Sequence, residues 1–141
     1  MINITNKVFD TVYTAVTTVD SSADVMDVPA EKFAKYPAVV VRESNNIPVR
    51  NTNTDDNSEN YTRISYEIRV YTGNQTGAKA KADQIFEAVD SAMKSLKFYR
   101  SMTRRLPNQD RTVYCLYGRY EVICSAPVVD GDNTTYYMFR R

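Results

Sequence analysis

The sequence predicts an α+β domain: a mainly antiparallel sheet of four to five strands with two helices packed on one face and a long polar hairpin loop. Three observations lead to this prediction. Residues 61–71 alternate apolar and polar side chains, which is the period of a strand with one buried face. Residues 4–19 and 78–96 place apolar side chains at helical spacing. The other apolar runs are short and bounded by turn residues, as expected for strands connected as hairpins.

The first elements are a helix and a short strand. The helix over residues 4–19 is rich in threonine and valine, which lose rotamer freedom in a helix, so we expect tertiary packing to hold it. Residues 29–35 are compatible with one helical turn, which Pro37 ends. Residues 38–42, centred on three consecutive valines, then predict a short buried strand.

Residues 45–60 predict an extended polar loop between the first two strands. Asparagine, threonine, aspartate and glutamate dominate this segment, so almost nothing in it can be buried. A connection of this length is uncommon inside a compact domain and is usually functional or disordered. Two interpretations stay open: a solvated polar loop, or an arm that orders against a neighbouring subunit.

The strand at 61–71 leads through a tight turn into the second helix. Gly73 breaks the strand, and Thr76 is the expected cap of a helix that begins at Ala78. Three alanines on the inner stripe of this helix permit a close approach to the sheet. We therefore expect the helix to lie across the apolar face of the preceding strand.

The last third of the chain predicts three more strands. Residues 98–106 alternate apolar with basic side chains and predict an edge strand. Residues 112–124 predict a long strand, in which Gly118 indicates a bulge or a close backbone contact. Residues 135–139 predict a final short strand. We expect residues 1–141 to form a single domain.

Bulk properties exclude several classes of protein. The formal net charge of the 141 residues is +1, so the global charge demands neither nucleic acid nor membrane as a partner. No run of about 18 apolar residues predicts a membrane span. Cys115 and Cys124 lie in one predicted strand, roughly 30 Å apart if it runs straight, and a disulfide needs Cα atoms within roughly 7 Å. We expect both thiols to be reduced, as in a protein made in the cytosol.

The sequence carries no recognisable catalytic or metal-binding motif. Because there is no histidine, a Ser-His-Asp or Cys-His arrangement is excluded, and two cysteines cannot form a four-cysteine site. Residues 73–79 lack the glycine spacing of a phosphate loop. The acidic segments 55–59 and 130–133 lack the calcium-loop pattern. We expect no enzymatic activity, no cofactor and no metal.

Basic residues gather between the second helix and the long strand, with only Asp110 opposing them. They are Lys94, Lys97, Arg100, Arg104, Arg105 and Arg111. Three interpretations stay open: a solvated edge protected from pairing by charge, contact with phosphate, or complementarity to acidic residues of another protein. The polar loop is the natural counterpart on a neighbouring copy. Its candidate interface residues are Arg50, Asp55, Asp56 and Glu59.

Five motifs, which cover most of residues 4–125, follow one another in a distinctive order. They are the N-terminal helix, the segment Tyr36 to Val41, the strand Ile64 to Tyr71, the helix with Ala82, Ile85, Val89 and Met93, and finally Phe98-Tyr99-Arg100 with the Pro107-Asn108 turn and Arg119-Tyr120-Glu121. In this order they resemble the small tail-terminator (tail-completion, head–tail joining) proteins of long-tailed bacteriophages. Such families usually have glycine just before the Phe98 position, where this chain has Lys97.

The resemblance implies a structural virion protein without a catalytic motif. It implies a subunit of a six-membered ring, assembled in the cytoplasm of the bacterial host, that caps the tail tube. Its partners would be further copies of itself, the tail-tube protein and a head-side neck or connector protein. Genome DNA would pass through the lumen without specific binding.

A ring needs two different complementary patches on each subunit. We expect the basic strand near residues 97–111 and the polar arm at 45–60 to supply them. The alternative functions are a neck connector or a tail-tube subunit and, from a different class, a small nucleic-acid-binding module that uses the basic cluster.

Overall fold

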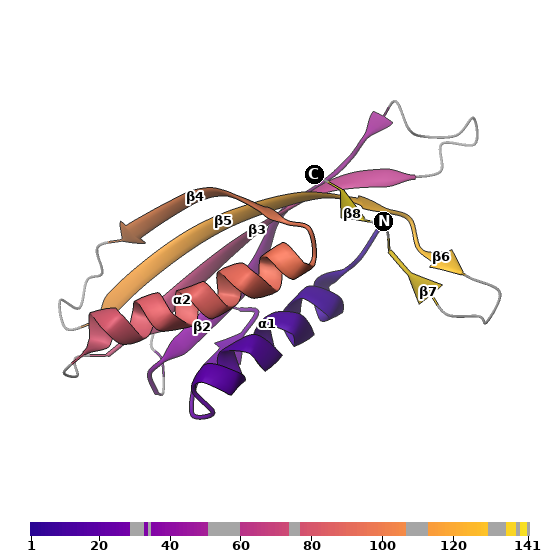
Figure 1. The fold of residues 1–141 in the computed structure, drawn as a ribbon. Helices are drawn as coiled ribbons and strands as arrows, with labels where there is room; N and C mark the ends of the chain where they lie inside the picture. Colours follow the sequence, from indigo (N-terminus) through magenta and orange to yellow (C-terminus); the bar gives the residue numbers. More distant parts are fainter. Residues whose placement is uncertain are drawn as a thin grey trace.

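The protein forms two layers, with two helices on one face of a sheet (Figure 1). The helices are α1 (Thr5–Val19) and α2 (Ala78–Ser95). This computed structural model confirms the predicted α+β class. The residues that it describes are 1–28, 33, 35–50, 60–73, 77–106, 113–129, 135–137 and 139–140.

The sheet is mostly antiparallel, and its main strands follow the order β1-β2-β3-β5-β4. Their bounds are β1 (Asp24–Met26), β2 (Ala38–Pro48), β3 (Tyr61–Thr72), β4 (Tyr99–Leu106) and β5 (Tyr114–Ser125). β1 runs parallel to β2, and the other neighbours are antiparallel. Of the three short strands near the C-terminus, β8 (Phe139–Arg140) pairs with β5, and β6 (Val128–Val129) pairs with β7 (Thr135–Tyr136).

The core lies between the helices and the sheet. The four alternating residues predicted to face inward from β3 are all buried: Ile64, Tyr66, Ile68 and Val70. α2 packs on β3 and β5, as expected for its alanine-containing stripe. α1 buries Val8, Val12 and Val16 against α2 and the sheet, so packing holds this helix despite its low intrinsic propensity.

Gly118 lies where the Phe86 side chain of α2 packs closely on the sheet. A Cβ atom at this position would lie 2.7 Å from Cζ of Phe86 on α2 and 3.0 Å from Cε2 of Tyr120. Pairing between β3 and β5 continues through Gly118 without a change of register. Of the two interpretations of this glycine, the close contact is therefore correct and the bulge is wrong.

The predicted first strand was too short and the predicted loop too long. β2 continues to Pro48, so residues 45–48 are paired with β3 rather than part of a loop. The amide of Asn46 donates to the carbonyl of Ile2 at 2.8 Å, and its Oδ1 accepts from Thr62 at 2.6 Å. These hydrogen bonds satisfy the Asn46 side chain in the polar outer half of β2. This part of the strand has no alternation of apolar residues from which it could be predicted. Residues 51–59 lie outside the described part of the chain.

Three smaller predictions need correction. The three-residue strand β1, which makes the parallel pair with β2, was not expected. α2 begins after Gly77, which has a left-handed φ of 83° and occupies the N-cap position. Thr76, the predicted cap, lies outside the described residues. The last predicted strand is two separate short strands, β7 and β8. The helical turn expected at 29–35 falls largely on residues that are not described.

Neither described helix is long and apolar enough to cross a lipid bilayer. Both cysteines are free and buried, as the sequence predicts.

Candidate interaction surface

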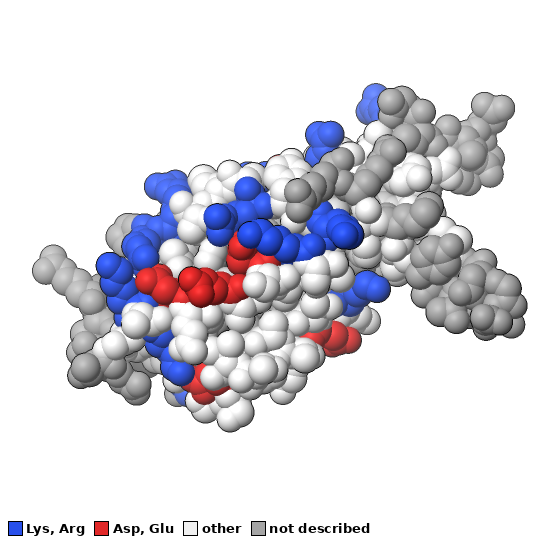
Figure 2. All heavy atoms as spheres, viewed as in Figure 1, with Lys and Arg blue, Asp and Glu red and all other residues white. Residues whose placement is uncertain are grey.

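The basic cluster of the sequence lies along β4, the last strand of the sheet. Every residue of β4 except Leu106 is exposed. Within the described part of the chain, β4 pairs only with β5, so its outer edge carries no neighbouring strand. Figure 2 shows basic side chains along this edge and a row of acidic side chains beside them, over α2. The prediction of a basic edge strand is confirmed.

Asp90 of α2 binds the first part of this cluster. Its carboxylate lies 2.8 Å from Nζ of Lys94 and 3.3 Å from the guanidinium of Arg100, and the Tyr120 hydroxyl donates to it at 3.0 Å. Burial alone would raise the pKa of Asp90, but the hydrogen bonds from Lys94 and Tyr120 and the charge of Arg100 together lower it. The side chain of Asp90 is only 13% exposed, so this carboxylate is an anchor between α2, β4 and β5.

Asp83 of α2 binds the second part. Its carboxylate lies 2.9 Å from Nη2 of Arg105, whose guanidinium also sits 5.4 Å from the centre of the Tyr114 ring. Both charged side chains are nearly half exposed, so we expect this pair to contribute at most about 1 kcal/mol. The expectation that only Asp110 opposes the cluster is therefore wrong. The acidic partners of Arg100 and Arg105 lie in the preceding helix, α2. An inspection of the charges next to the cluster in the sequence does not find them.

Lys97 and Arg104 make no ion pair in the described part of the chain. Lys97 has a φ of 68° and sits just past the end of α2. Its N–H bonds to the carbonyl of Lys94, and the N–H of Phe98 bonds to the carbonyl of Met93, at 2.9 and 3.1 Å. This pair of bonds is a Schellman motif, whose left-handed position glycine usually occupies. Lys97 therefore keeps the backbone conformation that a glycine would adopt there.

Of the other predicted interface residues only Arg50 is described, and it lies away from Arg104 and Arg105. Val49 bonds to Tyr61, which places Arg50 at the end of β3 that pairs with Ser125. Arg104 pairs with Tyr117, eight positions back along β5, or about 26 Å away. Arg50 thus lies near the opposite end of the sheet from Arg104 and Arg105. The remaining candidates, Asp55, Asp56, Glu59 and Arg111, lie outside the described residues, as does Asp110.

The sheet face turned away from the helices carries a network that the sequence analysis did not single out. Tyr99 donates to Glu121 at 2.7 Å, and Tyr117 donates to Glu67 at 2.8 Å. The guanidinium of Arg69 lies 5.5 Å from the Tyr117 ring centre. Burial first, and then the bond to Glu67, raises the pKa of Tyr117. The alternation of charged residues along β3 and β5 is the feature of the sequence that could have predicted this network. The face carries both acidic and basic side chains.

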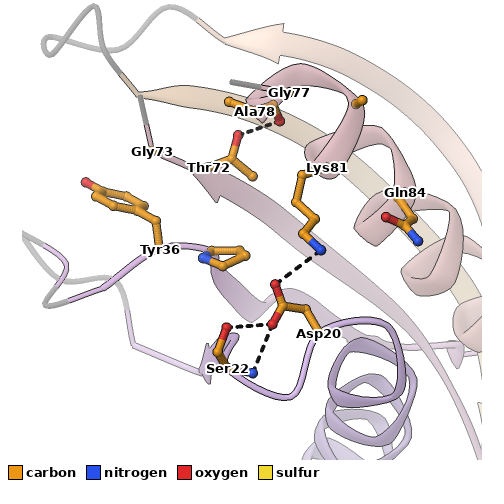
Figure 3. A pocket seen from close by; sticks show the side chains of 11 residues that line it. Asp20, Ser22, Tyr36, Thr72, Gly73, Gly77, Ala78, Lys81 and Gln84 are labelled. Carbon is orange, nitrogen blue, oxygen red and sulfur yellow. Dashed lines mark hydrogen bonds and ion pairs between the residues drawn. The ribbon is translucent and has the colours of Figure 1, made fainter. Parts of the chain in front are cut away.

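A pocket of about 440 Å³ lies where α1 ends and α2 begins (Figure 3). Lys81 extends from α2 toward Asp20, and their charged groups are 3.4 Å apart. The side chain and then the backbone N–H of Ser22 donate to Asp20 and lower its pKa. Asp20 and Lys81 are the only charged residues among the described lining, and they bind each other. This ion pair connects the end of α1 to α2, and the pocket contains no free charged group that could act on a substrate.

Among the described residues, no group of three or more histidine, cysteine, aspartate or glutamate side chains is placed to hold a metal ion. The chain matches no known protein-family model, and no curated protein matches it significantly.

Proposed function

We propose that this chain is a structural virion protein, a tail terminator that assembles into a ring, caps the tail tube and joins it to the head-side neck. The observation that carries the proposal is the pair of unlike edges of the sheet. One edge is the exposed basic strand β4, and the other is β2, which β1 covers only from Ala38 to Val40. Identical subunits close into a ring when two such different patches meet head to tail.

Two further features support the proposal. The order of motifs in the sequence resembles tail terminators, and the α+β class of the structure is the class that this resemblance implies. The one departure in sequence, Lys97 in place of glycine, preserves the left-handed backbone that glycine would provide. The departure therefore changes a side chain and leaves the turn between α2 and β4 intact.

The partial neutralisation of the basic cluster by α2 favours a ring over a nucleic-acid-binding module. Arg100 and Arg105 pair with Asp90 and Asp83, so the two carboxylates offset part of the positive charge that a phosphate would meet. A passage for DNA should not bind DNA tightly, and a net charge of +1 suits that role.

Electron microscopy of assembled particles with an antibody or a fused tag on this chain tests the proposal. We expect one ring of label at the head-proximal end of each tail tube. Label repeated along the tube would make the chain a tail-tube subunit, and label confined to tail-less heads would make it a neck connector. Particles without label would contradict a role in the virion.

A further inference from the structure

The sheet face turned away from the helices, called the open face below, is rich in arginine. Both described helices lie on the other face, so the open face has no covering helix in the described part of the chain (Figure 1). The strands β2 to β5 contain no lysine. Alternation and cross-strand pairing place the following charged residues on the open face: Arg42, Arg63, Arg69, Arg104, Arg119, Glu67 and Glu121. Its charge is therefore positive, and all its cations are guanidinium groups.

The two glutamates of the open face already have partners. Glu67 accepts a hydrogen bond from Tyr117 at 2.8 Å, and Glu121 accepts one from Tyr99 at 2.7 Å. Arg119 reaches Glu121 only at 3.9 Å. The other four arginines of this face have no ion pair in the described part of the chain. Most of the positive charge of the open face is therefore available to a partner.

A recess of about 50 Å³ lies between two of these unpaired arginines. The described residues that line it are Val40, Arg42, Glu67, Arg69 and Tyr71. Arg42 pairs with Glu67, and Arg69 pairs with Val40, so the two arginines are diagonal neighbours on β2 and β3, about 7–8 Å apart. The recess is larger than the volume of one water molecule in the liquid, about 30 Å³, and suits a group as small as a carboxylate.

A carboxylate also matches the chemistry of this recess. A guanidinium group offers N–H donors in a planar fork that fits the two oxygens of a carboxylate, and it has no acceptor. Arg42 and Arg69 supply two such groups, and Glu67 balances the charge of one of them. One positive charge is left, which a single carboxylate would neutralise.

The rest of the open face favours a protein as the source of that carboxylate. Three large apolar side chains are exposed on it: Ile47 is 56% exposed, Tyr99 40% and Met102 37%. Tyrosine, methionine and arginine are enriched at protein interfaces. A nucleic acid would instead bring a row of phosphates past Glu67 and Glu121, which would repel them.

We propose that the open face binds an acidic segment of a partner protein, and that one carboxylate of this segment sits between Arg42 and Arg69. The inference goes beyond the proposed ring and does not depend on it. In a ring joined through the edges of the sheet, the open face stays free for a further protein.

Fluorescence anisotropy with a labelled octaglutamate peptide tests the inference at low salt, with octaglutamine and an oligothymidylate as comparison probes. The wild type should bind octaglutamate and should not bind octaglutamine. Arg42→Gln and Arg69→Gln should each raise the dissociation constant about tenfold, as expected for the loss of one charge-assisted hydrogen bond. Arg105→Gln is the matched control, because it removes the same charge from the helix side of the sheet, and it should leave the dissociation constant nearly unchanged.

Glu67→Gln separates charge from folding. It removes the negative charge of the recess, while the amide oxygen can still accept from Tyr117, so it should tighten the binding of octaglutamate. Damage to the fold would not tighten binding. The inference is overturned if the wild type does not bind octaglutamate, or if Arg105→Gln weakens binding as much as Arg69→Gln does. Tighter binding of the oligothymidylate, weakened by the same two variants, would make the open face a nucleic-acid surface and would also overturn it.

The inference and the proposed function fail in different ways. Arg69→Gln should form rings as the wild type does. If this variant loses ring formation, the open face belongs to the contact between copies, and the inference fails while the proposed function stands. If octaglutamate binds as expected and the wild type forms no ring with tail tubes present, the proposed function fails and the inference stands.

Discussion

Replacing Gly118 by alanine should destabilise the fold by forcing α2 away from the sheet. The added Cβ would lie 2.7 and 2.8 Å from two carbons of the Phe86 ring, closer than real Cβ contacts allow. The Phe86 and Tyr120 rings are buried and lie 6.5 Å apart, so neither can turn aside freely. Overpacking of this kind costs about 1–3 kcal/mol, and the stiffer unfolded chain returns up to about 1 kcal/mol, which leaves a net loss of about 1–2 kcal/mol.

Urea denaturation followed by circular dichroism measures this loss. With a slope of about 2 kcal/mol per molar urea, the midpoint of Gly118→Ala should fall by roughly 0.5–1 M. The control is the pair Phe86→Leu and Gly118→Ala: because leucine removes the ring that the Cβ meets, the double variant should lose less stability than the two single losses summed. An unchanged midpoint for Gly118→Ala, or strict additivity of the pair, would refute the contact that the structure places there.

Three further outcomes follow from the edge of the sheet. Lys97→Gly should raise the free energy of unfolding by about 0.5–1 kcal/mol, because glycine adopts a φ of 68° without strain; a loss of stability in the same urea titration would contradict the Schellman turn. Asp90→Asn should lower stability by about 1–2 kcal/mol at pH 7. Because the bonds from Lys94 and Tyr120 and the charge of Arg100 hold the folded pKa of Asp90 below its ordinary value of 3.8, that difference should be full above pH 3.8 and shrink as the pH falls through the folded pKa; a difference that does not shrink as the pH is lowered below 3.8 would contradict the ion pairs. The purified chain should elute from a DNA column below physiological salt, and retention that disappears in an Arg104→Ala, Arg105→Ala variant would instead support a nucleic-acid-binding module.

The parts of the fold that the sequence predicted well are those with strong periodicity. β3 and α2 bury their apolar stripes, so a period of two and then of 3.6 residues identifies them. β1 and the outer half of β2 carry no such pattern. They are held by backbone pairing and by polar contacts such as those of Asn46, which depend on residues distant in sequence.

The candidate surface was predictable only in part. The basic residues of β4 are visible as a run in the sequence, but their partners Asp83 and Asp90 become neighbours only when α2 folds back onto β4.

Assembly is the premise of the whole interpretation, and the mass of the native particle tests it most directly. Native mass spectrometry of the protein released intact from purified virions should give a closed oligomer near 97 kDa, the mass of six 16.1 kDa subunits. A single 16.1 kDa species recovered from intact particles would contradict it, because the proposed contact between the two unlike sheet edges requires a second copy.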